Sequence, residues 1–219
     1  MRAYLHKRFI LDLIYPNRCP FCNSYIPYDK YYCTRCRDNL SPPPEHDEFT
    51  EIDFFTAVTK YDKFSIPLIN EMKKESNGYA LSAAAFMIFQ SLASEKLLSA
   101  IDIITYVPMR RKDKLKRGYN QTAIIARELA QLAEKPCTAL LKKVRDTSQQ
   151  KTLSAADRRK NVKNAFAHKS RHNIQGKTVL IIDDVCTTGS TLSEAAAKLK
   201  YAGAEKVIAS VFAKTGKIT

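Results

Sequence analysis

The sequence predicts an α/β fold, a mostly parallel sheet flanked by helices, with a small N-terminal module in front of it. Two observations lead to this prediction: strand and helix patterns alternate along residues 52–212, and four cysteines cluster between Cys19 and Cys36. Such alternation is typical of parallel sheets, because a helix carries the chain back to where the next strand begins. The stiff polar segment 41–45 separates the two units, so we predict domains at 1–45 and 46–219.

The composition is that of a globular protein with a packed core. The chain has 219 residues, of which 45% are hydrophobic and 26% are charged. Its apolar runs are far shorter than the roughly 20 residues that a membrane span takes. The N-terminal stretch 8–15 also carries Asp12, where a signal peptide would be uniformly apolar. We therefore expect a soluble, cytoplasmic protein.

The positive charge is concentrated in one part of the chain. The net charge is +14, and residues 105–172 hold 18 Lys and Arg against 5 Asp and Glu, a net charge of +13. A field of one sign attracts polyanions, so this segment suggests a polyphosphate ligand or a nucleic acid as partner. A solvated basic face would have the same composition, and the charge alone does not separate the two interpretations.

The first half of the chain begins with a helical pattern and then turns to strand. Apolar residues on one face predict a short helix over residues 4–14, which Pro16 ends. β-Prone residues predict a strand over 52–61. Residues 65–74 and 79–98 have helical patterns, and the second is so apolar that we expect it to be buried.

The middle of the chain continues the alternation and then loses it. A predicted strand at 101–107 is followed by a polar, cationic loop at 108–118 and an amphipathic helix over 121–132. A short segment near 138–144 precedes a polar stretch at 145–164 that has neither period. Loops of that length within a compact domain are usually functional.

The cysteines form two Cys-x-x-Cys pairs separated by ten residues: Cys19, Cys22, Cys33 and Cys36. Two such pairs complete a tetrahedral zinc site with no position left for water, which makes the site structural. A segment this short cannot bury enough apolar surface to fold alone, so metal binding would supply most of its folding free energy. The spacing favours Zn²⁺; an iron–sulfur cluster or disulfides stay open as alternatives.

Two adjacent acids follow an apolar strand predicted over 178–182. Asp183 and Asp184 precede a hydroxyl-rich loop that leads into a helix predicted over 191–202, and a last strand is expected at 207–212. Ligands of open α/β sheets bind outside the carboxyl ends of the strands, and a helix N-terminus can hold a phosphate. Paired carboxylates can accept hydrogen bonds from the vicinal hydroxyls of ribose, and their charge favours a transition state with a cationic sugar carbon. We therefore predict a sugar-phosphate site.

A P-loop nucleotide site is the main alternative for this region. Gly176-Lys177-Thr178 has the composition of the end of a P-loop. However, Arg171 stands where the first glycine of that loop is required, and Thr178 opens a strand instead of a helix. A second alternative, a fold that binds its ligand as a signal without turnover, stays open because motifs report binding more directly than chemistry.

The stretch 179–192 resembles the signature of the type I phosphoribosyltransferases over all fourteen residues. This resemblance implies a type I phosphoribosyltransferase-like sheet and a site for 5-phosphoribosyl-1-pyrophosphate (PRPP) with Mg²⁺. Asp183 and Asp184, the predicted catalytic residues, would hold the ribose hydroxyls. The residues implied for the 5′-phosphate are Thr187, Thr188, Gly189, Ser190 and Thr191.

The loop after the strand at 101–107 occupies the place of the pyrophosphate loop in those enzymes. Arg110 or Arg111 would meet the pyrophosphate there, and an exposed basic turn is the alternative for either one. Many type I enzymes read the nucleobase with a loop after the strand equivalent to 207–212, for which we find no counterpart. We expect the zinc module or the segment 46–100 to act as a hood over the site instead.

Taken together, the motifs resemble the bacterial competence ComF family over nearly the full length of the chain. The family implies a role in natural transformation: handling of incoming single-stranded DNA at the inner face of the cytoplasmic membrane, with the inner-membrane DNA-uptake machinery as a partner. Type I enzymes are often dimers, which leaves a homodimer open. The motifs are the four cysteines, Val107-Pro-x-x-Arg111, Arg117-Gly-Tyr-Asn-Gln121, Arg145-x-Thr147-x-Gln149, Arg158-x-x-Asn161, Ala165-Phe166 and the acidic strand.

Several cations could serve either the PRPP site or DNA. The segment 145–160 stands where a flexible loop closes over the active site in type I enzymes. Tyr119 and Phe166 could stack on bases or belong to the core. The function is thus that of a phosphoribosyltransferase or of a non-catalytic DNA-binding adaptor with a regulatory or vestigial PRPP pocket. The candidate cations are Arg117, Arg145, Lys151, Arg158 and Arg159.

Overall fold

The computed structural model describes residues 14, 16–45, 49–74, 78–110, 113, 115, 117–144, 164–169 and 171–216. No helix within these ranges has the length and apolar character that crossing a membrane requires. Most of the helix predicted at 4–14 and of the polar stretch 145–164 lies outside the described residues. The elements are α2 (Thr34–Asp38), β1 (Phe54–Lys60), α3 (Ile66–Glu71), α4 (Gly78–Ser94), η1 (Leu98–Ala100), β2 (Ile103–Tyr106), α6 (Gln121–Ala133), β3 (Leu141–Lys143), β4 (Phe166–His168), β5 (Thr178–Cys186), α8 (Ser190–Tyr201) and β6 (Lys206–Lys214).

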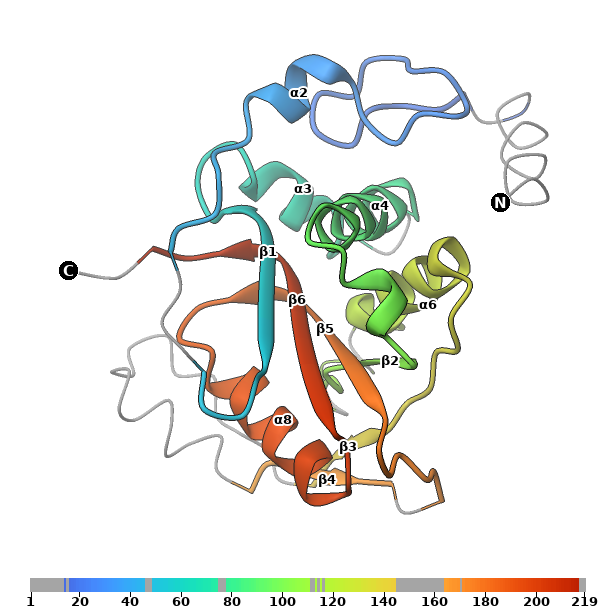
Figure 1. Cartoon of the computed structure of the whole chain (residues 1–219). Helices are drawn as coiled ribbons and strands as arrows, with labels where there is room; N and C mark the ends of the chain where they lie inside the picture. Colours follow the sequence, from blue (N-terminus) through green and yellow to red (C-terminus); the bar gives the residue numbers. More distant parts are fainter. Residues whose placement is uncertain are drawn as a thin grey trace.

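The main sheet has four parallel strands in the order β1-β6-β5-β2 (Figure 1). Its two central strands, β5 and β6, have nine residues each. Strands of parallel sheets are buried on both faces and therefore read as continuous apolar runs. This explains why residues 179–182 show no alternation of apolar and polar side chains. The α/β fold with a parallel sheet and flanking helices is confirmed.

Helices cover both faces of this sheet (Figure 1). Helices α4 and α6 pack on the face toward which Leu180 and Ile182 point, and α8 packs on the face of Val179 and Ile181. Successive side chains of a strand point to opposite faces, so one strand contributes to two cores. The apolar helix expected at 79–98 is α4, and its inner side chains are fully buried, as predicted.

Strand β5 is longer than the sequence predicted, because it continues past residue 182 to Cys186. Its neighbour β6 pairs with this extension, placing Asp183 opposite Val211, whereas β2 ends at Tyr106, opposite Ile182. The two acids therefore lie within the strand and not after it. They stand at the point where β5 loses its neighbour on one side, and this leaves room for a ligand.

The strands β3 and β4 form a short antiparallel pair beside α8. They extend the apolar core on the α8 face of the main sheet. Leu141 and Phe166, one from each strand, are both buried in that core, with 2% of their surface exposed. Of the two roles that the sequence left open for Phe166, the structure supports the core role. The strand at 166–168 was not predicted, since three residues are too few to show a period.

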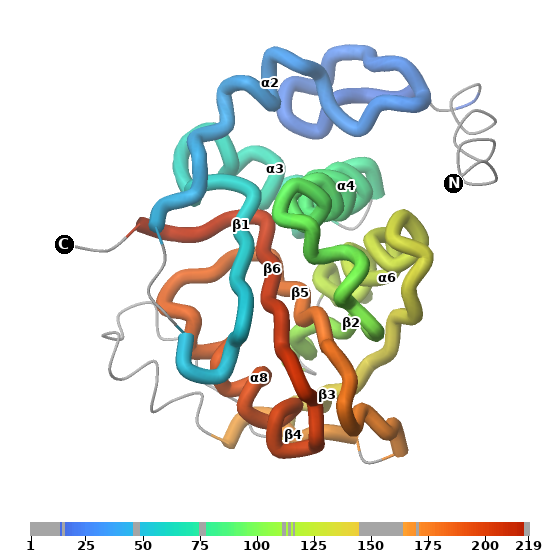
Figure 2. The backbone as a smooth tube through the Cα atoms, in the orientation of Figure 1, coloured from blue at the N-terminus to red at the C-terminus, as the bar shows by residue number. Residues whose placement is uncertain are grey.

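The cysteine module lies over α4, which separates it from the sheet (Figure 2). The Tyr31 ring stacks on Phe86 of α4 with ring centroids 4.2 Å apart. The Tyr32 hydroxyl donates a hydrogen bond to Oε1 of Gln90, one turn further along the same helix. Stacked aromatic pairs of this kind contribute about 0.5–1.5 kcal/mol beyond their buried area. The boundary predicted between residues 45 and 46 borders residues outside the described ranges and stays a prediction.

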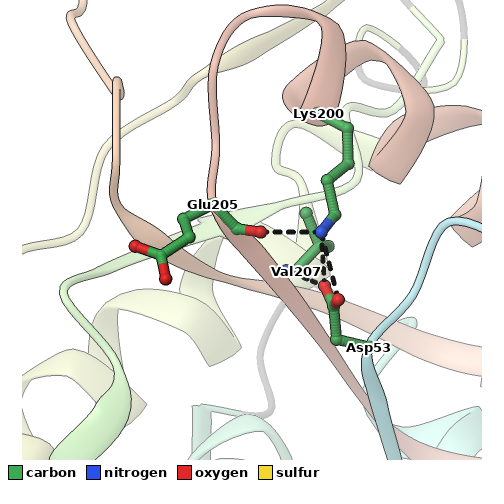
Figure 3. A network of polar contacts seen from close by, with 4 residues as sticks. All are labelled: Asp53, Lys200, Glu205 and Val207. Carbon is green, nitrogen blue, oxygen red and sulfur yellow. Dashed lines mark hydrogen bonds and ion pairs between the residues drawn. The ribbon is translucent and has the colours of Figure 1, made fainter.

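A polar network ties the start of β1 to the start of β6 and to α8 (Figure 3). Lys200 Nζ lies 2.8 Å from Oδ2 of Asp53 and donates a 2.7 Å hydrogen bond to the carbonyl of Glu205. Asp53 also accepts a 2.6 Å hydrogen bond from the amide of Val207. Although burial by itself would raise it, the pKa of Asp53 is lowered by Lys200 and by this amide. The network fixes the amino end of the sheet, opposite the acids of β5.

Candidate functional site

A cavity of about 540 Å³ opens at the carboxyl end of the sheet, where β2 ends and β5 continues. It brings together the acids of β5, the loop after β2 and the start of α6. Two of its lining residues, Tyr61 and Lys73, come from the segment 46–100, so that segment contributes to the hood as expected. Among the described residues, none from the zinc module lines the cavity, which counts against the other hood hypothesis. The remaining lining residues are Val107, Pro108, Met109, Arg110, Asp113, Arg117, Asn120, Gln121, Thr122, Lys143, Asp183, Asp184, Val185, Thr187, Thr191 and Thr215.

The two acids face the cavity with their carboxylates held by backbone amides. Oδ1 of Asp183 accepts a 2.9 Å hydrogen bond from the amide of Asp184, and Oδ1 of Asp184 accepts a 2.8 Å bond from the amide of Val185. Burial raises the pKa of Asp183 well above its usual value, and the neighbouring charge of Asp184 adds to the shift. A carboxyl group with a raised pKa beside a second carboxylate is typical of ligand-binding or catalytic sites.

Gln121 holds the second acid and was not among the predicted site residues. Its Nε2 donates a 2.7 Å hydrogen bond to Oδ2 of Asp184, and its Oε1 accepts a 2.9 Å bond from Nη1 of Arg117. Gln121 is buried, with 5% of its surface exposed. The Arg-Gly-Tyr-Asn-Gln motif was visible in the sequence, but the contact joins residues 63 positions apart. Only the fold reveals that the motif orients an acid of β5.

The same motif anchors the loop after β2. Asn120 caps α6 by accepting a 3.2 Å hydrogen bond from the amide of Thr122. The Thr122 hydroxyl donates a 2.9 Å bond to the carbonyl of Val107, the first residue after β2. An N-cap satisfies helix amides that have no partner within the helix. The capping pair thus fixes the start of α6 and the loop at 107–110 relative to each other.

Arg110 lies in this loop as the sequence predicted for a pyrophosphate contact. Its guanidinium is mostly buried, with 9% of the side chain exposed, and Nε lies 2.6 Å from Oδ2 of Asp113. A guanidinium carries its N–H donors in a planar fork, a geometry that suits phosphate oxygens. Arg111, the other candidate, lies outside the described residues, as do the loop cations Arg145, Lys151, Arg158 and Arg159. Of those cations, the described part of the chain places only Arg117 at the cavity.

The hydroxyl-rich loop turns sharply between β5 and α8. Gly189 has φ +73° at the N-cap of α8, and the ring of Phe49 lies directly against it: a Cβ added there would be 2.0 Å from Phe49 Cε1. The Thr215 hydroxyl donates a 3.2 Å hydrogen bond to the carbonyl of Thr187. Of the five residues predicted for the 5′-phosphate, Thr187 and Thr191 line the cavity, and Thr188, Gly189 and Ser190 form the turn behind them.

The second site is the cysteine cluster. The Sγ atoms of Cys19, Cys22, Cys33 and Cys36 all lie within 4.8 Å of one another, and none of the six cysteines forms a disulfide. Zn–S bonds of about 2.3 Å in a tetrahedron place the sulfurs roughly 3.8 Å apart, which is the separation of Cys22 and Cys33. The Ser24 hydroxyl, 3.3 Å from Cys22 Sγ, lowers the pKa of Cys22 to about 6, whereas burial raises the pKa of Cys19 and of Cys36.

Comparison with known proteins identifies both parts of the chain. Residues 115–218 match the phosphoribosyl transferase domain family, and residues 10–47, which include the four cysteines, match the double zinc ribbon domain family. Competence protein F of Haemophilus influenzae is 30% identical over 194 residues, which cover 86% of this chain and 81% of that protein. The chain belongs to the competence protein F family. The N-terminal module is accordingly a zinc ribbon with a structural zinc site.

The chain is also similar to a second curated protein and, more distantly, to solved structures. The DNA utilization protein YhgH of Escherichia coli is 29% identical, over 86% of this chain and 80% of its own length. Among solved structures, the glutamine PRPP amidotransferase of Bacillus subtilis aligns with a TM-score of 0.45 and 21% identity, over 66% of this chain and 30% of that one. In this competence protein F homologue, some residues that line the cavity, such as Asp183 and Asp184, lie within the match to the phosphoribosyl transferase domain. Others, such as Arg110, precede it.

Proposed function

We propose that this competence protein F homologue binds PRPP with Mg²⁺ in the cavity at the carboxyl end of the sheet and acts, as a phosphoribosyltransferase-like protein, in DNA uptake. The observation that carries the proposal is the convergence on one cavity of the paired acids, Asp183 and Asp184, with Arg110. Thr187 of the loop before α8 and Thr191 in the first turn of α8 line the same cavity. Arg110 is far from the other groups in the sequence, and the groups differ in charge, as the parts of a phosphorylated sugar require.

Each part of PRPP has a chemically matched partner. The 5′-phosphate lies at the N-terminus of α8, where amides, hydroxyls and the positive end of the helix dipole favour an anion. The ribose hydroxyls donate hydrogen bonds to Asp183 and Asp184, whose other oxygens are already held by amides. The pyrophosphate approaches Arg110 and competes with Asp113 for its guanidinium.

The carboxylates also suit the metal that accompanies PRPP. Mg²⁺ prefers oxygen ligands, and it is commonly held by one or two carboxylates together with substrate phosphates. Asp183 and Asp184 supply such oxygens at the cavity wall. The ion would neutralise charge on the pyrophosphate. It would also offset the repulsion between the two carboxylates that helps to raise the pKa of Asp183.

The DNA part of the proposal is supported by the relatives and by the charge. The names of the two relatives refer to competence and to DNA utilization. The basic segment 105–172 supplies the field that a DNA backbone requires. We place the protein in the cytoplasm, at the inner membrane where single-stranded DNA arrives. If PRPP binds without turnover, the cavity is regulatory and the protein is a DNA-binding adaptor.

Calorimetry of the zinc-loaded full chain with PRPP and Mg²⁺ tests the ligand site. We expect the double variant Asp183→Asn with Asp184→Asn to lose binding by about 100-fold or more, since two hydrogen bonds to charged groups contribute about 1.5–3 kcal/mol each. The matched control is Asp29→Asn with Glu205→Gln, which removes two acids exposed far from the cavity. Equal PRPP affinity in both double variants would refute the site, and product formation with an acceptor would separate the enzyme from the adaptor.

A further inference from the structure

A second cavity, of about 440 Å³, adjoins the first. The two cavities share Pro108 and Met109 of the loop after β2, the N-cap Asn120 of α6, and Lys143 of β3. A wall made of the same few residues separates a ligand in one cavity from a ligand in the other. Occupation of the second cavity therefore bears directly on the loop that carries Arg110.

All of the charged residues that line the second cavity are cations. The charged residues that line it are Arg127 from α6, Lys142 and Lys143 from β3, and Lys169, which follows β4. Among the described residues, no Asp or Glu lines this cavity, whereas three acids line the first one. Four cations from three parts of the chain around one hollow produce a positive potential that attracts polyanions. The basic segment of the sequence thus gathers at a specific place.

The other residues that line the second cavity are mostly apolar or aromatic. Tyr106 from the end of β2 and Tyr119 before α6 line it together with Met109 and Ile124. The Tyr119 hydroxyl lies 2.9 Å from the carbonyl oxygens of both Met72 and Lys74 and donates its one hydrogen to this pair of acceptors, which fixes the orientation of the ring. Single-stranded nucleic acids bind where cations track the backbone and aromatic side chains contact the bases. A simple polyphosphate would have no use for these walls.

We propose that the second cavity binds single-stranded nucleic acid, with phosphates against Arg127, Lys142 and Lys169 and a base against the tyrosine wall. The inference rests on the proposed function, and it adds the place where DNA binds. A nucleotide in this cavity lies next to the PRPP site across Pro108, Met109 and Lys143. Binding of the two ligands is therefore coupled, and each changes the affinity of the other by the same factor.

Fluorescence anisotropy with a labelled oligothymidylate of about twelve nucleotides tests the site on the full, zinc-loaded chain. In Arg127→Gln with Lys142→Gln, both outside the PRPP cavity, we expect affinity to fall roughly tenfold or more. Each lost phosphate contact reduces the steepness of log affinity against log salt by about 0.7. The double variant should therefore have a dependence that is less steep by about 1.4. Lys177→Gln with Lys206→Gln, exposed at the opposite end of the sheet, removes the same charge and should change neither.

Two further arms separate the outcomes. An oligonucleotide of the same length without bases should bind more weakly, and Tyr106→Leu should weaken binding where Tyr106→Phe does not. Equal binding of the abasic oligonucleotide would overturn the base contact and identify a general polyphosphate site. If Lys177→Gln with Lys206→Gln lost as much affinity for the oligonucleotide as Arg127→Gln with Lys142→Gln, DNA would bind elsewhere. The proposed function would then stay intact. A wild type that binds PRPP but no oligonucleotide would overturn both the inference and the DNA part of the proposed function.

Discussion

The zinc ribbon and the parallel sheet maintain their structures by different means. In the ribbon, the described residues include few buried apolar side chains, among them Ile26 and Tyr31, and four cysteines converge on one point. The sheet has two extensive apolar cores, one on each face, and buries Ile181 and Phe212 completely. A small module therefore depends on its metal, whereas the sheet depends on its packing.

The difference also separates their roles. The ribbon contacts α4 by way of Tyr31 and Tyr32, and the segment after it bonds to Asp62 through Ser41. The ribbon contributes no described residue to the cavity that we propose for PRPP. The cavity is built from strand ends and from the start of α6. Damage to the ribbon should therefore leave the ligand site in place, and changes at the ligand site should leave zinc bound. Three predictions test this separation.

Removal of zinc should have the largest effect. Structural zinc contributes about 10–16 kcal/mol of apparent binding free energy in zinc-finger peptides, so Cys33→Ser or chelation should unfold the ribbon. In hydrogen exchange, amides of residues 17–38 should lose their protection while those of β5 and β6 keep theirs. PRPP binding should persist. Cys137→Ser, outside the ribbon, is the control and should retain one zinc per chain.

Loss of protection in β5 and β6 at the same rate as in the ribbon would contradict this prediction. It would mean that the ribbon and the sheet unfold as one cooperative unit through the Tyr31 and Phe86 stack.

Gly189→Ala should have an intermediate effect, confined to the sheet and its ligand site. The new Cβ would meet the Phe49 ring at 2.0 Å, and φ +73° is itself unfavourable for alanine. We expect the free energy of unfolding to fall by about 1–3 kcal/mol. Each kcal/mol should lower Tm by about 2–4 °C. PRPP binding should also weaken. Thermal unfolding and calorimetry measure both.

Gly176→Ala is the matched control, because Gly176 has φ +69° but nothing within 4 Å of the added Cβ. It carries the backbone cost without the clash, so its loss of stability should be smaller. If the two variants were equally destabilised, the contact between Phe49 and the loop before α8 would not matter.

Local patterns in the sequence predicted one of these regions more completely than the other. The cysteine spacing specified the ribbon ligands because all four lie within one short segment, and the run at 179–182 specified a buried strand. The extension of β5 to Cys186 was missed, since it depends on pairing with β6 while β2 stops at Tyr106. No local signal reports where a neighbouring strand ends.

The sequence pointed to several residues that line the cavity, but not to the residues that hold them in place. Asp183, Asp184, Arg110 and Thr187 were chosen from the sequence, and the structure brings them to one cavity. The hydrogen bond from Gln121 to Asp184 was beyond reach, because contacts between distant residues follow from the topology alone. The position of the ribbon over α4 likewise follows from tertiary packing. Of the two hoods that the sequence left open, the segment 46–100 lines the cavity and the described part of the ribbon does not.

Asp183→Asn should have the smallest effect on stability, and it should be favourable. Burial raises the pKa of Asp183, so the folded state binds more protons than the unfolded state at pH values between the usual and the raised pKa. Stability of the wild type therefore falls as pH rises through that window. In the absence of PRPP and divalent ions, Asp183→Asn and the wild type should have equal stability at pH values below the usual pKa. At neutral pH it should be more stable by on the order of 1 kcal/mol, about 2–4 °C in Tm.

Asp53→Asn supplies the opposite sign at the other end of the sheet. The pKa of Asp53 is lowered in the folded state although partial desolvation opposes the shift, so its contribution is present above the usual pKa and is lost as pH falls through the lowered value. That variant should be less stable than the wild type at neutral pH. If both variants shifted Tm in the same direction, charge at these positions would not decide stability. The acid at the carboxyl end of β5 would then carry no cost that ligand binding has to offset.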